Sequence, residues 1–310
     1  MPFLDTARLR IHYEEAGSGP EVFVLVHGNF ASWRWWKPVF ERLPVGWRAV
    51  APDLRGCGEN PDGAPAQDRS AHDIPQLADD LGGFVDGLQL GAFHLVGHSL
   101  GGAVALQYAL RHQPRVLSLL LVAPAPPTGL AAMREGTSTS ARLLRSLKPD
   151  DHTSMAALRS SYRLQRALGT NRWMLRRALA EMMPAASLDP AVAASLLADA
   201  ARMSPEALVG FLQALHRWNV EAELPGFQVP TVILWGARDV LVPRAALQKM
   251  ARLLPRGELR VWPDVGHSPQ LERPDRFVAL LAESPRPHLG KRLRLLLGRA
   301  ARWCIAAIHA

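Results

Sequence analysis

The sequence has few cysteines, and they lie far apart. Cys57 and Cys304 are the two cysteines among 310 residues. Such a pair cannot form a disulfide framework or a cysteine metal cluster, and this usage is typical of a reducing compartment. The chain also lacks an uninterrupted apolar run of about 18 residues, so the sequence predicts no transmembrane helix.

A secretory signal is also missing from the first ten residues, MPFLDTARLR. They have no apolar core, and they carry Asp5. We therefore expect a cytoplasmic protein. The length is sufficient for one large domain, or for one domain that carries an insertion.

The net charge of +8 is unevenly distributed. Residues 1–127 and 229–285 together hold 18 basic and 19 acidic residues, and residues 128–228 hold 12 and nine. Residues 286–310 hold six basic residues and no acidic one. Because no nucleic-acid motif accompanies this excess, we expect no nucleic-acid partner.

Short apolar runs alternate with amphipathic stretches along the chain. Continuous apolar strands between helices are typical of a parallel sheet covered by helices on both faces. Residues 8–17 alternate with period two and predict an antiparallel edge strand. The other strands are predicted at 22–28, 47–56, 93–99, 116–124, 230–239 and 257–267. The helices between and after them are predicted at 35–43, 73–90, 102–112, 243–254 and 274–283.

One interval interrupts this alternation, between Pro124 and Pro230. Its helical patterning over about 100 residues is too long for a loop and predicts an inserted helical subdomain. We expect a core of residues 1–124 and 229–285, with residues 125–228 as a lid over the carboxyl ends of the strands. The alternative is a second core without a role in substrate binding.

The motif Gly-His-Ser-Leu-Gly at 97–101 lies where an apolar strand meets a helix. A sharp turn there would force Ser99 into a strained backbone conformation, and the flanking glycines would remove colliding Cβ atoms. The turn would project the hydroxyl above the sheet, at the N-terminus of the following helix. This is the position expected of a nucleophile.

A serine nucleophile needs a base and an acid that orients the base. Behind such a motif the expected chain order is Ser, then Asp or Glu, then His. Asp239 and His267 follow two apolar strands in that order, so we expect both to meet Ser99 above the sheet. The alternatives are that Asp239 caps the next helix and that His267 is an ordinary surface histidine.

Acyl transfer also needs donors for the oxyanion. The His-Gly pair at 27–28 allows a tight turn that would present the backbone N–H of Asn29, and Leu100 would supply the second N–H. Phe30 and Leu241 follow strands at the same edge of the sheet, and we expect them to line the substrate pocket. Phe30 would otherwise serve in packing.

Together these motifs resemble the α/β-hydrolase superfamily, and within it the lidded esterases, lactonases and C–C hydrolases. The resemblance spans about residues 8–284. It implies an α/β-hydrolase fold and a water-dependent acyl hydrolase that needs no cofactor or metal, with Ser99, Asp239 and His267 as the triad. The motifs that carry it are HGNF (27–30), DLRGCG (53–58), GHSLGG (97–102), GARD (236–239) and GH (266–267).

Differences from other groups of this superfamily narrow the range of expected activities. Ser99 stands where epoxide hydrolases and haloalkane dehalogenases have an aspartate, and Ser268 where C–C hydrolases usually have a tryptophan. Proline iminopeptidases typically show Gly-Gly-Ser-Trp-Gly at the nucleophile. We therefore expect a serine hydrolase of ester or lactone bonds that works through an acyl-enzyme, with thioesters also compatible. The alternatives are a C–C or amide hydrolase of the same fold, or a membrane-associated accessory protein.

The residues of the predicted lid favour an apolar acyl or ring substrate. Trp173 and Trp218 accompany many Leu, Met and Ala residues, although these would equally serve the core of the lid itself. Arg172, Arg176 and Arg177 would bind a carboxylate or form a solvated helix face.

The C-terminal segment, 286–310, lies beyond the resemblance. Residues 291–310 would form an amphipathic helix with Lys and Arg on one side and Leu, Trp and Ile on the other. Such a helix suits an anionic membrane surface, and we expect either peripheral membrane contact or docking on the body or a second subunit.

Overall fold

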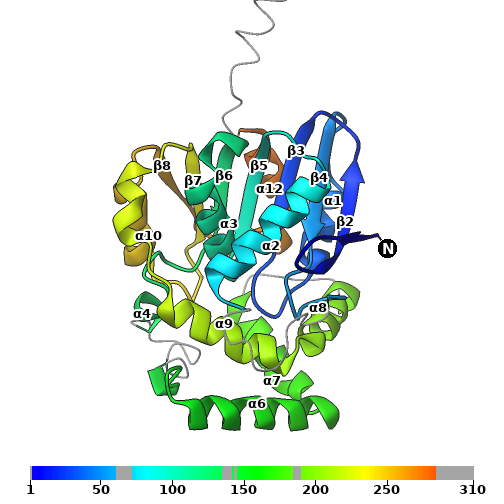
Figure 1. The fold of residues 1–310 in the computed structure, drawn as a ribbon, viewed down its shortest axis with the longest axis vertical. Helices are drawn as coiled ribbons and strands as arrows, with labels where there is room; N and C mark the ends of the chain where they lie inside the picture. The colour runs from blue at the N-terminus through cyan, green and yellow to red at the C-terminus, as the bar shows by residue number, and fades with distance from the viewer. Residues whose placement is uncertain (1, 61–71, 135–141, 143–144, 184–189, 284–310) are drawn as a thin grey trace, which may run out of the picture.

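An eight-stranded sheet forms the centre of the computed structural model, which describes residues 2–60, 72–134, 142, 145–183 and 190–283 (Figure 1). The strand order is β1-β2-β4-β3-β5-β6-β7-β8. The predicted C-terminal helix, 286–310, lies outside the described residues. The strands are β1 (Phe3–Asp5), β2 (Arg10–Gly17), β3 (Glu21–Val26), β4 (Trp47–Pro52), β5 (Phe93–His98), β6 (Val116–Val122), β7 (Thr231–Gly236) and β8 (Gly257–Trp262).

The pairing confirms the mostly parallel sheet that the sequence predicts. β1 with β2 and β2 with β4 are antiparallel, and every other pair is parallel. Because parallel strands end at the same edge, the loops after β3, β5, β7 and β8 meet there.

Two details of the predicted strands are wrong. β2 is not the edge strand, because the three-residue β1 pairs outside it with Phe3 opposite His12, and so short a strand has no period to detect. The strands β7 and β8 end at Gly236 and Trp262, so Asp239 and His267 lie in loops beyond them. The chain turns at once after β7, where the N–H of Asp239 donates to the carbonyl of Gly236 at 3.0 Å.

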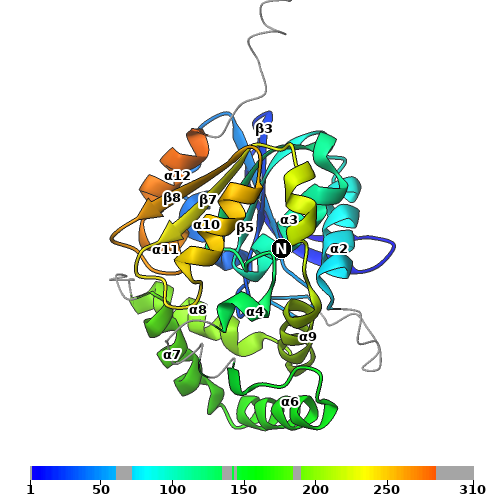
Figure 2. The same cartoon turned by 90° about the vertical axis from the view of Figure 1, so that its left-hand side faces the viewer.

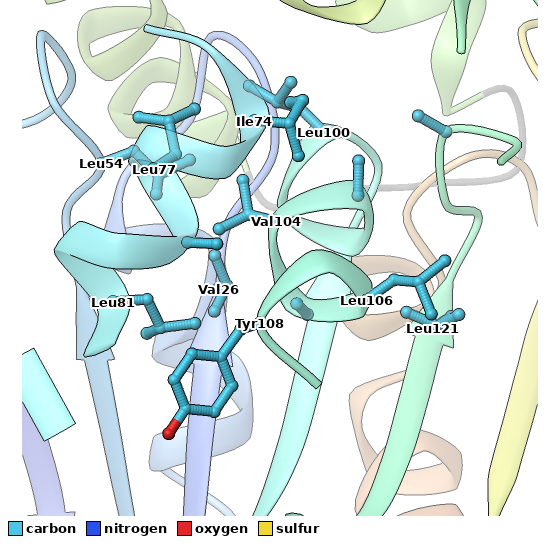
Figure 3. Packing of buried hydrophobic residues seen from close by; sticks show 14 of the residues in the cluster. Val26, Leu54, Ile74, Leu77, Leu81, Leu100, Val104, Leu106, Tyr108 and Leu121 are labelled. Atoms are coloured by element: carbon cyan, nitrogen blue, oxygen red, sulfur yellow. The ribbon is translucent and has the colours of Figure 1, made fainter. Parts of the chain in front are cut away.

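Helices cover both faces of the sheet, as expected (Figures 1 and 2). On one face α2, α3 and α10 pack against strand residues such as Val26 and Leu121 (Figure 3). On the other, α1 and α12 pack against Phe23, Leu25 and Val122. The alternation of neighbouring strand residues between the two clusters explains why the strands are apolar throughout. These helices are α1 (Lys37–Phe40, after a 3₁₀ turn at Trp33–Trp36), α2 (Ile74–Gly87), α3 (Leu100–Arg111), α10 (Arg244–Leu253), α11 (Pro269–Glu272) and α12 (Pro274–Ala282).

Between β6 and β7 the described chain is helical, in agreement with the sequence. All of these elements lie within the predicted range 125–228, here called the insertion, and they group at one end of the sheet (Figures 1 and 2). The backbone N–H of Ser204 donates to the carbonyl of Gly56 at 2.9 Å, which ties the insertion to the core. The elements are α4 (Leu130–Met133), α6 (His152–Ala167), α7 (Asn171–Met182), α8 (Pro190–Arg202), α9 (Pro205–Arg217) and a 3₁₀ helix (Glu221–Gly226). No helix in the described part of the chain combines the length and apolar character needed to cross a membrane.

Leu121 in the central strand β6 tests this account of the core. Its side chain is fully buried, so Leu121→Ala removes buried carbon atoms and leaves a cavity. We expect the free energy of unfolding to fall by about 2–5 kcal/mol, measured by urea denaturation. Val45→Ala is the control, because Val45 is fully exposed and its change should stay within about 0.5 kcal/mol. Equal losses in the two variants would contradict the assigned core.

Candidate active site

Ser99 lies at the junction of β5 and α3 in a backbone conformation that is rare for a residue with a side chain. Its φ and ψ are 54° and −118°. A Cβ atom at Gly97 would approach the carbonyl oxygen of Gly101 to 2.4 Å, and one at Gly101 would approach the carbonyl oxygen of His27 to 2.2 Å. The turn therefore requires glycine on both sides, as the sequence predicts.

The surrounding structure holds Ser99 in this strained conformation. Its N–H donates to the carbonyl of Val122 at 3.0 Å, and its carbonyl accepts from Gly102 at 2.9 Å and Ala125 at 3.0 Å. Backbone strain of this kind costs about 1–3 kcal/mol and persists where neighbours over-determine it. Ser99 is only partly buried between the buried residues His98 and Leu100, so its hydroxyl is accessible.

Asp239 and His267 form a hydrogen-bonded pair above the sheet. His267 Nδ1 lies 2.9 Å from Asp239 Oδ2, and the other carboxylate oxygen accepts from the N–H groups of Leu241 at 2.8 Å and Val242 at 3.1 Å. The side chain of Asp239 is 0% exposed and that of His267 is 3% exposed. A buried carboxylate needs such partners, and the pair leaves Nε2 of His267 as the free ring nitrogen.

The structure also brings the loop that carries His267 to the Ser99 turn. His98 Nε2 donates to the carbonyl oxygen of His267 at 3.0 Å, and the centres of the two rings are 5.0 Å apart. Between the described residues Ser99 and His267 there is no side-chain hydrogen bond in this structure. Catalytic hydrogen bonds of this kind are often long without substrate and tighten when it binds.

The loop after β3 lies directly against Ser99. A Cβ atom at Gly28 would stand 2.9 Å from the Cβ of Ser99. In the next residue, the side-chain oxygen of Asn29 accepts from the N–H of Phe30 at 3.0 Å, and Phe30 has a φ of 56°. Within the described chain, the backbone N–H groups of Asn29 and Leu100 have no acceptor. Two unsatisfied amide donors therefore belong to segments that adjoin the serine.

The two expected pocket residues lie in one apolar cluster. Phe30 and Leu241 are half-buried and pack against the cluster that also contains Tyr162 of the insertion. The ring centres of Phe30 and Tyr162 are 6.4 Å apart in an edge-to-face arrangement. The insertion therefore contacts the loop beside Ser99.

Sequence reasoning missed the role of His98. The ring is fully buried, with Nδ1 unpartnered and Trp35 stacked at a centroid distance of 5.7 Å. Burial, and after it the proximity of His267, holds the pKa of His98 well below its ordinary value of 6.5. His98 is therefore neutral at physiological pH. The motif contains this histidine, but its partner lies far away in the sequence.

Glu272 was also missed. Its carboxylate accepts from the N–H of Gly266 at 2.9 Å and from the N–H of Ser268 at 3.2 Å, so it holds the residues on both sides of His267. Burial raises the pKa of Glu272, and these hydrogen bonds oppose the rise. A glutamate five residues after a candidate base is the only signal that the sequence offers.

Metal ligands do not gather in the described part of the chain. It holds no group of three or more His, Cys, Asp or Glu side chains that could bind a metal ion. Cys57 is 1% exposed and belongs to the large apolar cluster.

Comparisons with known proteins agree with this fold. A family model described as the alpha/beta hydrolase fold matches residues 21–274. An esterase from Exiguobacterium antarcticum superimposes with a TM-score of 0.72 at 24% identity, covering 90% of this chain and 97% of that one. At this identity the likeness shows the fold.

Two curated relatives are enzymes that hydrolyse their substrates. The chain is 30% identical to the pimeloyl-[acyl-carrier protein] methyl ester esterase of Aromatoleum aromaticum, over 84% of this chain and 96% of that protein. It is 27% identical to the 2-hydroxymuconate semialdehyde hydrolase of a Pseudomonas species, over 89% and 90%. These relatives support hydrolase activity. The family match, the sheet order and the serine turn have one common explanation, which is that this chain belongs to the alpha/beta hydrolase fold family.

Proposed function

We propose that this protein is a serine hydrolase of carboxylic ester or lactone bonds, with Ser99 as nucleophile, His267 as base and Asp239 as the acid that orients the base. The observation that carries the proposal is the strained turn at Ser99, which a hydrogen bond connects to the loop of His267. The ring of His267 is in turn hydrogen-bonded to the buried carboxylate of Asp239. A structural serine would not need this conformation. The hydrolases among the relatives support the same reaction class.

The reaction proceeds in two halves. Ser99 Oγ attacks the carbonyl carbon while His267 Nε2 takes the hydroxyl proton, and a tetrahedral oxyanion forms. The C–O bond of the ester then breaks, and His267 gives its proton to the departing alcohol oxygen. A water molecule attacks the acyl-enzyme with His267 again as base, which releases the acid and restores Ser99.

Asp239 has two tasks in this scheme. It accepts from Nδ1–H of His267, which fixes the tautomer whose Nε2 lone pair faces outward. It also balances the positive charge when His267 becomes an imidazolium ion. The neutral state of His98 matters here, because a second cation 5.0 Å away would oppose protonation of His267.

The oxyanion would be stabilised by the backbone N–H groups of Asn29 and Leu100. Their lack of an acceptor within the described chain supports this role, since both N–H groups are free to donate to an oxyanion. The positive end of the α3 dipole adds to the effect at Leu100. Removal of one such donor typically costs about 3–4 kcal/mol in the transition state.

The insertion would act as a lid. Its backbone reaches the base directly, because the N–H of His267 donates to the carbonyl of Met182 at the end of α7 at 2.8 Å. Tyr162 and Phe30 would form part of the pocket with Leu241. These apolar walls favour an apolar acyl or ring group, and Ser268 after the base favours ester or lactone over C–C cleavage.

Covalent labelling tests the proposal. Ser99 Oγ should attack the phosphorus of a fluorophosphonate and form a P–O bond as the P–F bond breaks and fluoride leaves, so the wild type should be labelled and Ser99→Ala should not. The kcat for p-nitrophenyl esters should fall by about a millionfold in that variant. Ser160→Ala is the control, because Ser160 is exposed on α6 and its loss should change neither result. Folded wild-type protein that takes up no label would contradict the proposed serine hydrolase activity and favour an accessory protein.

The bond that is cleaved is tested with a panel of p-nitrophenyl esters, lactones, a vinylogous diketone and an aminoacyl amide. We expect kcat/KM to be highest for an ester or a lactone with an apolar acyl group. Highest kcat/KM for the diketone or the amide would contradict the proposed bond without contradicting the nucleophile.

His98 is proposed as a positioning residue for His267. His98→Leu removes the N–H donated to the His267 carbonyl and should lower kcat by about 10- to 100-fold, with KM little changed. His98→Gln can place an amide N–H near the same point and should retain most of the activity. Equal losses in both variants, or none, would contradict this role.

The low pKa of His98 also predicts a pH effect on stability. Below the ordinary value of 6.5, the unfolded chain binds a proton at His98 that the folded chain does not, so stability falls as the pH falls. The contribution is at most about 1.4 kcal/mol per pH unit. Urea denaturation should be measured between pH 4.5 and 7.5, about three pH units that include the ordinary histidine pKa. The free energy of unfolding should depend less steeply on pH in His98→Gln than in the wild type. An unchanged dependence would contradict the burial argument.

A further inference from the structure

Three large apolar side chains are exposed on either side of the turn between α6 and α7. Leu164 is 60% exposed, Leu168 66% and Trp173 72%. Trp218, at the end of α9, is by contrast 5% exposed, and its indole N–H donates to Gln107 at 2.9 Å. We call residues 159–177 the insertion tip. Its apolar side chains face solvent, and exposed apolar residues that gather in one region often mark an interaction site.

The pattern of α7 shows that Trp173 is not needed for packing within the insertion. At about 100° per residue, the buried residues Asn171, Leu175 and Leu179 form one side of the helix. Trp173 and Arg177 lie on the opposite side, and Arg172 and Arg176 lie along the edge of the buried side; all four residues are exposed. The helix thus satisfies its own core with one face and presents arginine and tryptophan on the other.

The insertion tip is also strongly basic. Residues 152–182 contain six arginines, and Glu181 is their one acidic residue. Arg163 pairs with Glu206, and Arg166 donates to the carbonyl of Met203. The remaining arginines of this stretch have no ion-pair partner among the described residues, and they are Arg159, Arg172, Arg176 and Arg177.

The position of these helices leaves the tip accessible. In both views α6 forms the end of the described chain that is farthest from the sheet, with α7 beside it (Figures 1 and 2). The tip therefore projects from the molecule as an outer corner. A corner of this kind can meet a broad surface without obstruction by the rest of the described chain.

We propose that the insertion tip binds the surface of an anionic lipid bilayer. Trp173, Leu164 and Leu168 enter the headgroup region, where an indole ring is favoured, while the arginines bind lipid phosphates. A bilayer surface supplies an apolar layer and an anionic layer together, which matches the two kinds of side chain. An acidic protein partner would match the charge alone.

Vesicle sedimentation with the full chain tests the charge component. The wild type should bind vesicles of phosphatidylcholine with 30% phosphatidylglycerol, about a third anionic lipid, and bind pure phosphatidylcholine more weakly. A variant with Arg172→Gln, Arg176→Gln and Arg177→Gln should bind the anionic vesicles about 100-fold more weakly, at about fivefold per charge. Melting temperature and turnover of a soluble ester should stay at wild-type values.

A matched variant controls for net charge. Arg244→Gln, Arg252→Gln and Arg256→Gln remove three exposed arginines from α10 and the turn after it, outside the insertion, and should leave vesicle binding unchanged. Equal binding by the two triple variants would overturn the proposal, and this result includes the case in which residues 284–310 carry the binding. Absence of wild-type binding to anionic vesicles would also overturn it.

Fluorescence tests the apolar component. Lipids brominated on the acyl chain quench tryptophans that enter the bilayer, and the chain has nine tryptophans. Trp173→Phe keeps an aromatic ring, so the variant should still sediment with anionic vesicles but lose the quenching seen in the wild type. Equal quenching in the two proteins would show that Trp173 stays outside the bilayer and would contradict the proposal.

Discussion

The sharp turn at Ser99 is the constraint on which the rest of the site depends. A φ of 54° is unfavourable for a residue with a Cβ atom, and it persists because buried β5 and α3 leave the chain no other path. The turn aims the hydroxyl out of the sheet and starts α3 with the free amide of Leu100. It also requires the close approach of Gly28, which brings the loop with Asn29 alongside. One strained residue thus fixes the place of its own hydroxyl and adjoins the segments that carry both free amide groups.

The second half of the site is a histidine held on several sides. Asp239 is hydrogen-bonded to the ring of His267, and the ring of His98 donates a hydrogen bond to the carbonyl of His267. Glu272 accepts hydrogen bonds from the N–H groups on both sides of His267, and the carbonyl of Met182 accepts from the N–H of His267. His267 is therefore connected to the serine turn, to the loop after β7 and to the insertion. A shift of α7 would act on the backbone of His267 before it acted on Ser99.

Local patterns in the sequence were enough to predict the mostly parallel sheet and the helices between β6 and β7. These features depend on periodicity and on residues that stand beside one another. The strand β1 was not predicted because three residues are too few to show a period. His98 and Glu272 were not identified from the sequence because their hydrogen bonds join them to a distant or irregular segment. No pattern near either residue indicates such a contact. The predicted strands at β7 and β8 were too long because their ranges ran on through the turn residues to Asp239 and His267.

A crystal structure with an alkylboronic acid would test the central claim most directly. Boron should form a bond to Ser99 Oγ and become tetrahedral, in imitation of the ester intermediate. One boronate oxygen should then lie about 2.7–3.1 Å from the amide nitrogens of Asn29 and Leu100. His267 Nε2 should be within hydrogen-bond distance of Ser99 Oγ or of the second boronate oxygen. A boronate bound to another residue, or a His267 ring that remains out of reach of the adduct, would contradict the account.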